Sequence, residues 1–205
     1  MLALEDLGRE TYARSWERMH ALLEARIAGS APDTLLVVEH EPVYTLGRRK
    51  DALLNVLDPG DVPVLQVERG GDVTWHGPGQ ITAYPIVALP PGRQDLHRFM
   101  HELEEAALRA CADFGLTAQR DPRNTGVWAG GRKLASVGVA CRRWVTWHGL
   151  ALNVDPDLRY FERINPCGMT PGIMTSMAEE LGHSLDFQAV KASLCAHLQG
   201  LFGDI

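Results

Sequence analysis

Apolar residues recur at helical spacing in three parts of this 205-residue chain, near its start, its middle and its end. The spacing predicts a helix over about 10–27, a second helix between a cap at Asp95 and Gly115, and a third after a cap at Asp186. Strand-like apolar segments fill the parts between, at 34–39, 43–46, 64–67, 81–89, 125–129, 132–142 and 145–154. Strands outnumber helices, so we predict a single domain over residues 1–205, of the α/β (α+β) class, with one sheet covered by helices.

The amino-acid composition argues against several classes of function. A formal net charge of −6 argues against a general nucleic-acid binder, which needs a basic surface. No apolar run approaches the roughly 18 residues of a membrane span, and the acidic N-terminus is not a secretory signal. Four scattered cysteines without a C-x-x-C pair indicate free thiols in a reducing compartment. We therefore expect a cytoplasmic protein with no membrane or nucleic-acid partner.

The segment from Arg69 to Gln80 holds four glycines, a proline, two charges and a histidine between two apolar strand-like runs. Glycine loses more backbone entropy on folding than other residues, so a dense cluster indicates that another group approaches the backbone closely. Loops that are anchored between buried strands commonly carry binding chemistry. An ordinary hairpin connection rich in glycine and proline would have the same composition, so both interpretations stay open here.

One cysteine differs from the others in its surroundings. Cys111, Cys141 and Cys195 lie in apolar patterns typical of small core residues, whereas Cys167 lies in the turn Asn165-Pro166-Cys167-Gly168. A nucleophilic cysteine also needs a group that lowers its pKa. Lys133, one of only three lysines, begins an apolar strand and could be that group, or it could be a lysine at the rim of the sheet.

Two histidines are further candidates for a base or a substrate donor. His76 and His148 each follow a Thr-Trp pair and precede a glycine, although each could instead hydrogen-bond the backbone where a strand ends. The pair His97 and His101 lacks the H-E-x-x-H pattern of a zinc site, and no P-loop or G-x-G-x-x-G motif is present. The sequence predicts no metal and no nucleotide cofactor.

Several blocks, in order along the chain, resemble the lipoate–protein ligase B family of octanoyl-[acyl-carrier-protein]:protein N-octanoyltransferases. The principal block is Arg69-Gly70-Gly71, Thr74, His76-Gly77-Pro78-Gly79-Gln80 and Tyr84-Pro85. The others cover 39–47, 126–128, 132–138, 144–154 and 166–168. Tryptophans at 75 and 147 stand where the family would have tyrosine or another residue, and they bear on the shape of the acyl pocket.

The resemblance implies the biotin/lipoate ligase fold, a mixed sheet flanked by helices, without an ATP site or any other cofactor. It assigns Cys167 as the nucleophile that carries the acyl group as a thioester, and Lys133 as its activating partner. The implied substrate-binding residues are Arg69, Gly70, Gly71, Asp72, Val73, Thr74, Trp75, His76, Ser136, Val137, Gly138, Gly149, Leu150 and Ala151.

The implied reaction moves an octanoyl group from acyl carrier protein to a lysine, the first step of endogenous protein lipoylation. The recipients are lipoyl domains of 2-oxo acid dehydrogenases and the glycine-cleavage H protein. Both partners are acidic, so we expect docking at a positive patch formed by Arg48, Arg49, Lys50, Arg142 and Arg143. The alternatives are an ATP-dependent lipoate or biotin ligase, a non-catalytic module that binds lipoyl domains or acyl chains, and a cysteine thioesterase.

Overall fold

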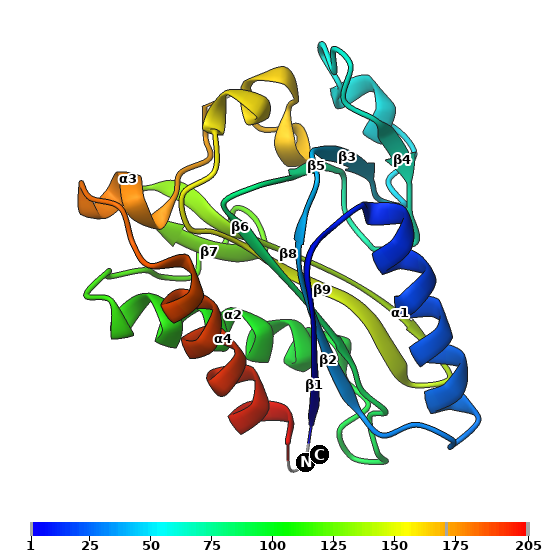
Figure 1. Cartoon of the computed structure of the whole chain (residues 1–205). Coiled ribbons are helices and arrows are strands. Elements are labelled where there is room, and N and C mark those ends of the chain that lie inside the picture. The colour runs from blue at the N-terminus through cyan, green and yellow to red at the C-terminus, as the bar shows by residue number, and fades with distance from the viewer. Residues whose placement is uncertain (1, 171, 204–205) are drawn as a thin grey trace.

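A six-stranded mixed sheet forms the centre of the molecule in the computed structural model, which describes residues 2–170 and 172–203 apart from the side chain of Cys167. Its strand order is β1-β2-β6-β9-β8-β7 (Figure 1). Only the β1–β2 pair is parallel, and every other neighbouring pair is antiparallel. The strands are β1 (Ala3–Glu10), β2 (Thr34–His40), β6 (Gln80–Ile86), β7 (Gly126–Ala129), β8 (Arg132–Arg142) and β9 (Val145–Asn153).

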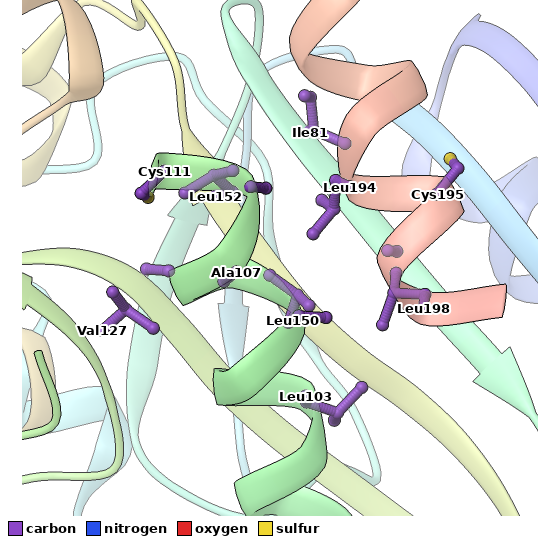
Figure 2. Close-up of a cluster of buried hydrophobic side chains, with 14 of the residues drawn as sticks. Ile81, Leu103, Ala107, Cys111, Val127, Leu150, Leu152, Leu194, Cys195 and Leu198 are labelled. Atoms are coloured by element: carbon purple, nitrogen blue, oxygen red, sulfur yellow. The ribbon is translucent and has the colours of Figure 1, made fainter. Parts of the chain in front are cut away.

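Helices cover both faces of this sheet. On one face lie α2 (Leu96–Asp113) and α4 (Phe187–Phe202), and the short α3 (Met177–Leu181) precedes α4. Figure 2 shows how Leu103 and Ala107 of α2 and Leu194 and Leu198 of α4 meet the β9 side chain of Leu150 in the main core. On the other face, α1 (Tyr12–Ile27) packs Met19, Leu22 and Leu23 against β2, β6 and β9.

A second sheet of three strands, in the order β4-β3-β5, accompanies the first. Its members are β3 (Val43–Leu46), β4 (Val64–Gln66) and β5 (Val73–His76). Three short 3₁₀ helices lie near it, η1 (Ala52–Asn55), η2 (Leu158–Arg163) and η3 (Pro166–Gly168), and β5 contacts all three. Tyr44, Val73, Trp75 and Phe161 form a small core between the sheet and these turns.

The predicted class is confirmed, and α2 and α4 begin at the predicted caps. Asp95 and Asp186 each accept hydrogen bonds from the first-turn amides of α2 and α4. The structure differs from the prediction in having two sheets, because 73–76 pairs with β3 as a strand inside the glycine-rich segment. The edge strand β1 was also not predicted. Within the described part of the chain, no helix combines the length and apolarity that crossing a bilayer would require.

Candidate active site

A narrow cavity of about 50 Å³ lies between the larger sheet and the glycine-rich segment. Its floor consists of residues from β6, β8 and β9, and its roof consists of residues 69–74 and His76. Tyr12 at the start of α1 and Pro166 of η3 also line it. Concave, mostly apolar sites with a few convergent polar groups are typical of small-ligand pockets.

The pairing of β8 with β9 explains the shape of the floor. Ser136 lies opposite Ala151, and Gly138 lies opposite Gly149, so these four residues share one face of the sheet. A β-carbon at Gly138 would lie 3.2 Å from the carbonyl oxygen of Gly70, which is closer than ordinary packing allows. The glycine therefore lets the 69–71 segment lie against β8, where Gly70 N donates to Val139 O over 2.9 Å.

A chain of hydrogen bonds fixes His76 in the roof. Asn153 Nδ2 donates to the Thr175 carbonyl, so its Oδ1 accepts from Gln80 Nε2 over 2.9 Å. Gln80 Oε1 then accepts from His76 Nδ1 over 2.7 Å, which places the ring proton on Nδ1. Thr45 Oγ1 lies 3.2 Å from His76 Nε2 and accepts from Arg69. Burial and the nearby Arg69 charge lower the pKa of His76 to about 3, so this histidine is neutral at pH 7.

The structure brings together every predicted substrate-binding residue except Trp75, which does not line the cavity. Side chains alternate along β5, so Thr74 and His76 face the cavity while Trp75 faces the smaller core. Its ring stacks on Tyr160 at a centroid distance of 4.8 Å. Trp147 lies outside the cavity as well, so neither unusual tryptophan forms part of its wall.

Lys133 lies at one end of the cavity, and the residue as a whole is only 2% exposed. Its Nζ donates to Asn124 Oδ1, a partner that the sequence analysis did not identify. The Lys133 amide donates to Ile173 O over 2.8 Å, and Thr175 N donates to Lys133 O over 2.9 Å. These bonds attach the segment after η3 to the start of β8.

Cys167 belongs to η3 by its backbone, but its side chain lies outside the described residues. The turn closes through Gly168 N, which donates to Asn165 O over 3.0 Å, and Gly168 has a left-handed φ of +71°. Pro166, the preceding residue, lines the same cavity as Lys133. The predicted nucleophile and its predicted partner therefore belong to segments that border one cavity.

Four aromatic or histidine side chains lie near the other end of the cavity, and of these only His148 was a candidate from the sequence. Tyr12, Tyr84 and His148 line the cavity, and His40 Nε2 lies 2.7 Å from the hydroxyl of Tyr84. Burial, assisted by the Arg69 charge, lowers the pKa of His148 to about 4. No local motif could identify this group, because its members come from α1, β2, β6 and β9.

The residues expected to form a docking patch lie in two separate segments. Arg48, Arg49 and Lys50 follow β3, and the Arg49 guanidinium lies 3.4 Å from the Asp72 carboxylate. Arg142 ends β8 and pairs with Glu24, and Arg143 follows in the turn. Arg48 and Cys141, which precedes Arg142, line one open groove.

A mixed sheet with this arrangement is the fold of lipoate and biotin protein ligases. A bi-partite lipoate protein ligase from Thermoplasma acidophilum superposes with a TM-score of 0.74 at 14% identity, covering 98% of this chain and 84% of that one. A biotin protein ligase from Aquifex aeolicus, in complex with biotin and ATP, superposes with a TM-score of 0.62 at 13% identity, covering 100% and 72%. At such identities the likeness establishes the fold alone.

Sequence comparison establishes the family. Residues 11–199 match the family described as lipoyl protein ligase A/B catalytic domain, and the chain belongs to this family. An octanoyltransferase from Gloeobacter violaceus is 50% identical over 164 residues, which are 80% of this chain and 74% of that protein. An octanoyltransferase from Geobacter metallireducens is 43% identical over 203 residues, covering 99% and 94%. The resemblance to the octanoyltransferases is confirmed.

Proposed function

We propose that this protein is an octanoyltransferase that moves an eight-carbon acyl group from acyl carrier protein to a lysine of a lipoyl domain. The observation that carries the proposal is the apolar cavity, which is bordered both by Lys133 and by Pro166 of the turn that contains Cys167. Relatives named octanoyltransferase at 43–50% identity support the same reaction.

In the first half-reaction the Cys167 thiolate attacks the thioester carbonyl of the acyl carrier. The carbon–sulfur bond to the carrier breaks, and the leaving thiolate takes a proton from the Lys133 ammonium group. One thioester replaces another, so this step is close to thermoneutral and needs no ATP. The acyl chain lies in the cavity, where burial of each methylene contributes about 0.8 kcal/mol.

In the second half-reaction the neutral amine of the recipient lysine attacks the acyl-Cys167 carbonyl. The new carbon–nitrogen bond gives an amide, and the Cys167 thiolate leaves. Lys133, which lost its proton in the first step, accepts the proton that the attacking nitrogen releases. The ammonium and thiolate pair is restored, and protons balance over the cycle.

Other thiols are poor candidates for the nucleophile. Burial raises the pKa of Cys111 to about 12 and that of Cys195 to about 11, which leaves almost no thiolate at neutral pH. Burial also raises the pKa of Cys141, which lies on β8 away from the cavity. The position of Cys167 in a turn beside the cavity distinguishes it from these three.

The proposal predicts a covalent intermediate at Cys167. After mixing with octanoyl-acyl carrier protein, intact mass spectrometry should show one octanoyl adduct, mapped to Cys167 by peptide analysis. Cys167→Ser should abolish transfer to a lipoyl domain, and Lys133→Ala should lower kcat by about 10²- to 10⁴-fold, as expected for loss of an acid–base group. Cys141→Ser serves as the matched control and should retain activity.

Each alternative predicts a different outcome of the same assay. A requirement for ATP with free lipoate or biotin would indicate a ligase, and release of octanoate to water would indicate a thioesterase. Octanoyl binding without turnover would indicate a non-catalytic module. An adduct on another residue would refute the assigned nucleophile.

Charge reversal at Arg48, Arg49 and Lys50 tests the proposed docking patch, because it should raise KM for the acidic carrier.

A further inference from the structure

The loop between α2 and β7, residues 114–125, brings Asn124 to the Lys133 side chain. The Lys133 Nζ donates a hydrogen bond to Asn124 Oδ1. An ammonium group has donors and no acceptor, so the amide must present its oxygen to the lysine. Asn124 is half-buried and Lys133 is buried, so the contact joins the loop to the interior of the site.

The backbone of Asn124 is fixed independently of its side chain. Trp128 Nε1 donates to the Asn124 carbonyl oxygen over 3.1 Å, and the Asn124 amide donates to Asp121 O over 3.3 Å. Trp128 is itself fully buried and exchanges two backbone hydrogen bonds of 2.8 Å with Gln119. The Arg123 guanidinium lies over the Trp128 ring, 4.5 Å from its centroid. The loop therefore holds the Asn124 amide in a defined position.

The pairing of β7 with β8 places the same tryptophan beside the lysine. Trp128 is the cross-strand partner of Lys133, directly after a shift in register that follows Val127. The Lys133 Nζ lies 6.0 Å from the centroid of the Trp128 ring, at the outer limit of a cation–π contact. Trp128 thus anchors the loop through its indole N–H and borders the lysine with its ring.

The charged and titratable groups on the elements around Lys133 have hydrogen-bonding partners of their own where the structure describes their side chains. The roof contributes Arg69, Asp72 and His76, α2 contributes Glu104, α3 contributes Glu180, the loop contributes Asp121 and Arg123, and η3 contributes Cys167. Each carboxylate accepts from other donors, which are Asn55 and Val73 N for Asp72, Arg120 and Gly126 N for Glu104, Arg132 for Glu180, and Arg123 for Asp121. The hydrogen bond from Lys133 Nζ goes instead to a neutral amide.

The proposed reaction requires Lys133 to alternate between two protonation states. It gives up a proton as an ammonium group in the first half-reaction and accepts one as an amine in the second. A carboxylate at position 124 would favour the ammonium form, because an opposite charge within about 4–6 Å stabilises a charged group. An amide oxygen carries no net charge and accepts a hydrogen bond from either form. An asparagine therefore holds Nζ without fixing its protonation state.

We propose that Asn124 is the positioning residue for Lys133, whose amide oxygen holds Nζ in place through both half-reactions and leaves the lysine able to lose and regain a proton. The inference rests on the proposed function, because it assumes that Lys133 is the acid–base group of the transfer. A purely structural role for Asn124 would stabilise the loop and leave the pH dependence of the transfer unchanged.

The test measures the two half-reactions of the full-length protein separately. The octanoyl-enzyme is formed with octanoyl-acyl carrier protein and isolated. Its single-turnover transfer to an excess of lipoyl domain is then followed by mass spectrometry between about pH 6 and pH 10. Hydrolysis without the lipoyl domain is measured in parallel and subtracted. The recipient lysine is the same throughout, so differences between variants come from the enzyme.

Asn124→Asp keeps the shape of the side chain and adds a negative charge. The midpoint of its rate against pH should move upward by about 1–3 pH units, which slows the transfer at pH 7 by about 10- to 1,000-fold. Formation of the octanoyl-enzyme should slow much less, because Lys133 enters that half-reaction as the ammonium form. Asn124→Ala removes the acceptor without adding a charge, so it should slow the transfer by about 10- to 100-fold with no upward move of the midpoint.

Thr125→Asp is the matched control, because Thr125 is the next residue of the loop and is exposed. A carboxylate there meets water, which screens its charge, so the midpoint should stay at the wild-type value. Thermal unfolding followed by circular dichroism establishes that each variant is folded. Asn124→Glu, which carries the same charge on a longer side chain, replaces Asn124→Asp if that variant does not fold.

Failure of the proposal and failure of the proposed function give different results. A wild-type protein that forms no octanoyl-enzyme, or that transfers no octanoyl group, would refute the proposed function itself. Wild-type transfer together with an unchanged midpoint in the folded carboxylate variant at position 124 would refute the positioning role of Asn124. An equal upward shift in Thr125→Asp would also overturn it, because the effect would then come from charge on the loop and not from the contact at Nζ.

Discussion

Gly126 determines where the Lys133 side chain can lie. It has a φ of +139°, and a β-carbon there would lie 2.3 Å from the Ala135 carbonyl oxygen and 2.8 Å from Lys133 Cε. The Gly126 amide also donates to the buried carboxylate of Glu104 over 2.8 Å. Glycine, the only residue type without a β-carbon, thus occupies position 126, where β7 passes Lys133.

Gly126→Ala should therefore affect both folding and chemistry. We expect a loss of about 3 kcal/mol or more in the free energy of unfolding, because the methyl group overlaps backbone atoms that cannot move freely. Octanoyl transfer should fall as Lys133 is displaced. Gly131→Ala is the control, because Gly131 has a φ of +79° but no atom lies near its β-carbon position. This variant should lose only about 1–2 kcal/mol in the free energy of unfolding. Urea unfolding measures the loss of stability, and activity assays measure the loss of octanoyl transfer. Equal losses in the two variants would contradict the steric argument.

The sequence singled out residues that line the cavity where a motif carried them, and it missed those that only the fold brings together. The glycines and Arg69 of the 69–76 segment were found because they form a recognisable block. Trp75 was included with them, although strand alternation turns it to the other side of β5. His148 was considered, but its position at the end of the cavity depends on the register of β8 and β9.

At the scale of elements, the helix caps are local features and could be predicted closely. Asp186 precedes α4 and accepts from Gln188 N over 2.9 Å and from Ala189 N over 3.3 Å. Asp186→Ala should lower stability by about 1 kcal/mol, and Asp186→Asn should cost little because an acceptor remains. For a domain of this size the alanine variant should melt about 2–4 °C lower in a thermal scan. Equal melting temperatures for the two variants would show that the cap contributes nothing.

Two strands, β1 and β5, were not predicted from the sequence, and each omission has a physical reason. β1 is a parallel edge strand with a polar sequence and mostly exposed side chains, so it lacks the alternation that marks a half-buried strand. β5 is four residues long and follows two glycines, and its hydrogen bonds go to β3, about thirty positions earlier in the chain. Pairing over such distances leaves no periodic signal in a local window.

At the scale of the whole molecule, the two sheets and α1 enclose three buried histidines. Burial lowers the pKa of His40 well below its ordinary value, that of His76 to about 3 and that of His148 to about 4. An unfolded chain would bind protons at these residues near pH 6.5. The folded protein therefore keeps all three neutral through a range of pH in which the unfolded chain is protonated.

This difference predicts loss of stability between pH 6.5 and about pH 4. In that range the unfolded state binds more protons than the folded state, so the free energy of unfolding falls as pH falls. Each histidine contributes up to about 1.4 kcal/mol per pH unit, or about 4 kcal/mol for three between pH 6 and pH 5. Urea unfolding at pH 7, 6 and 5 measures the slope of the free energy of unfolding against pH. His76→Gln should reduce this slope by the contribution of about one proton, whereas substitution of the exposed His183 should leave it unchanged. A free energy of unfolding that stays constant from pH 7 to pH 5 would mean that the three rings are protonated in the folded state as readily as in the unfolded one.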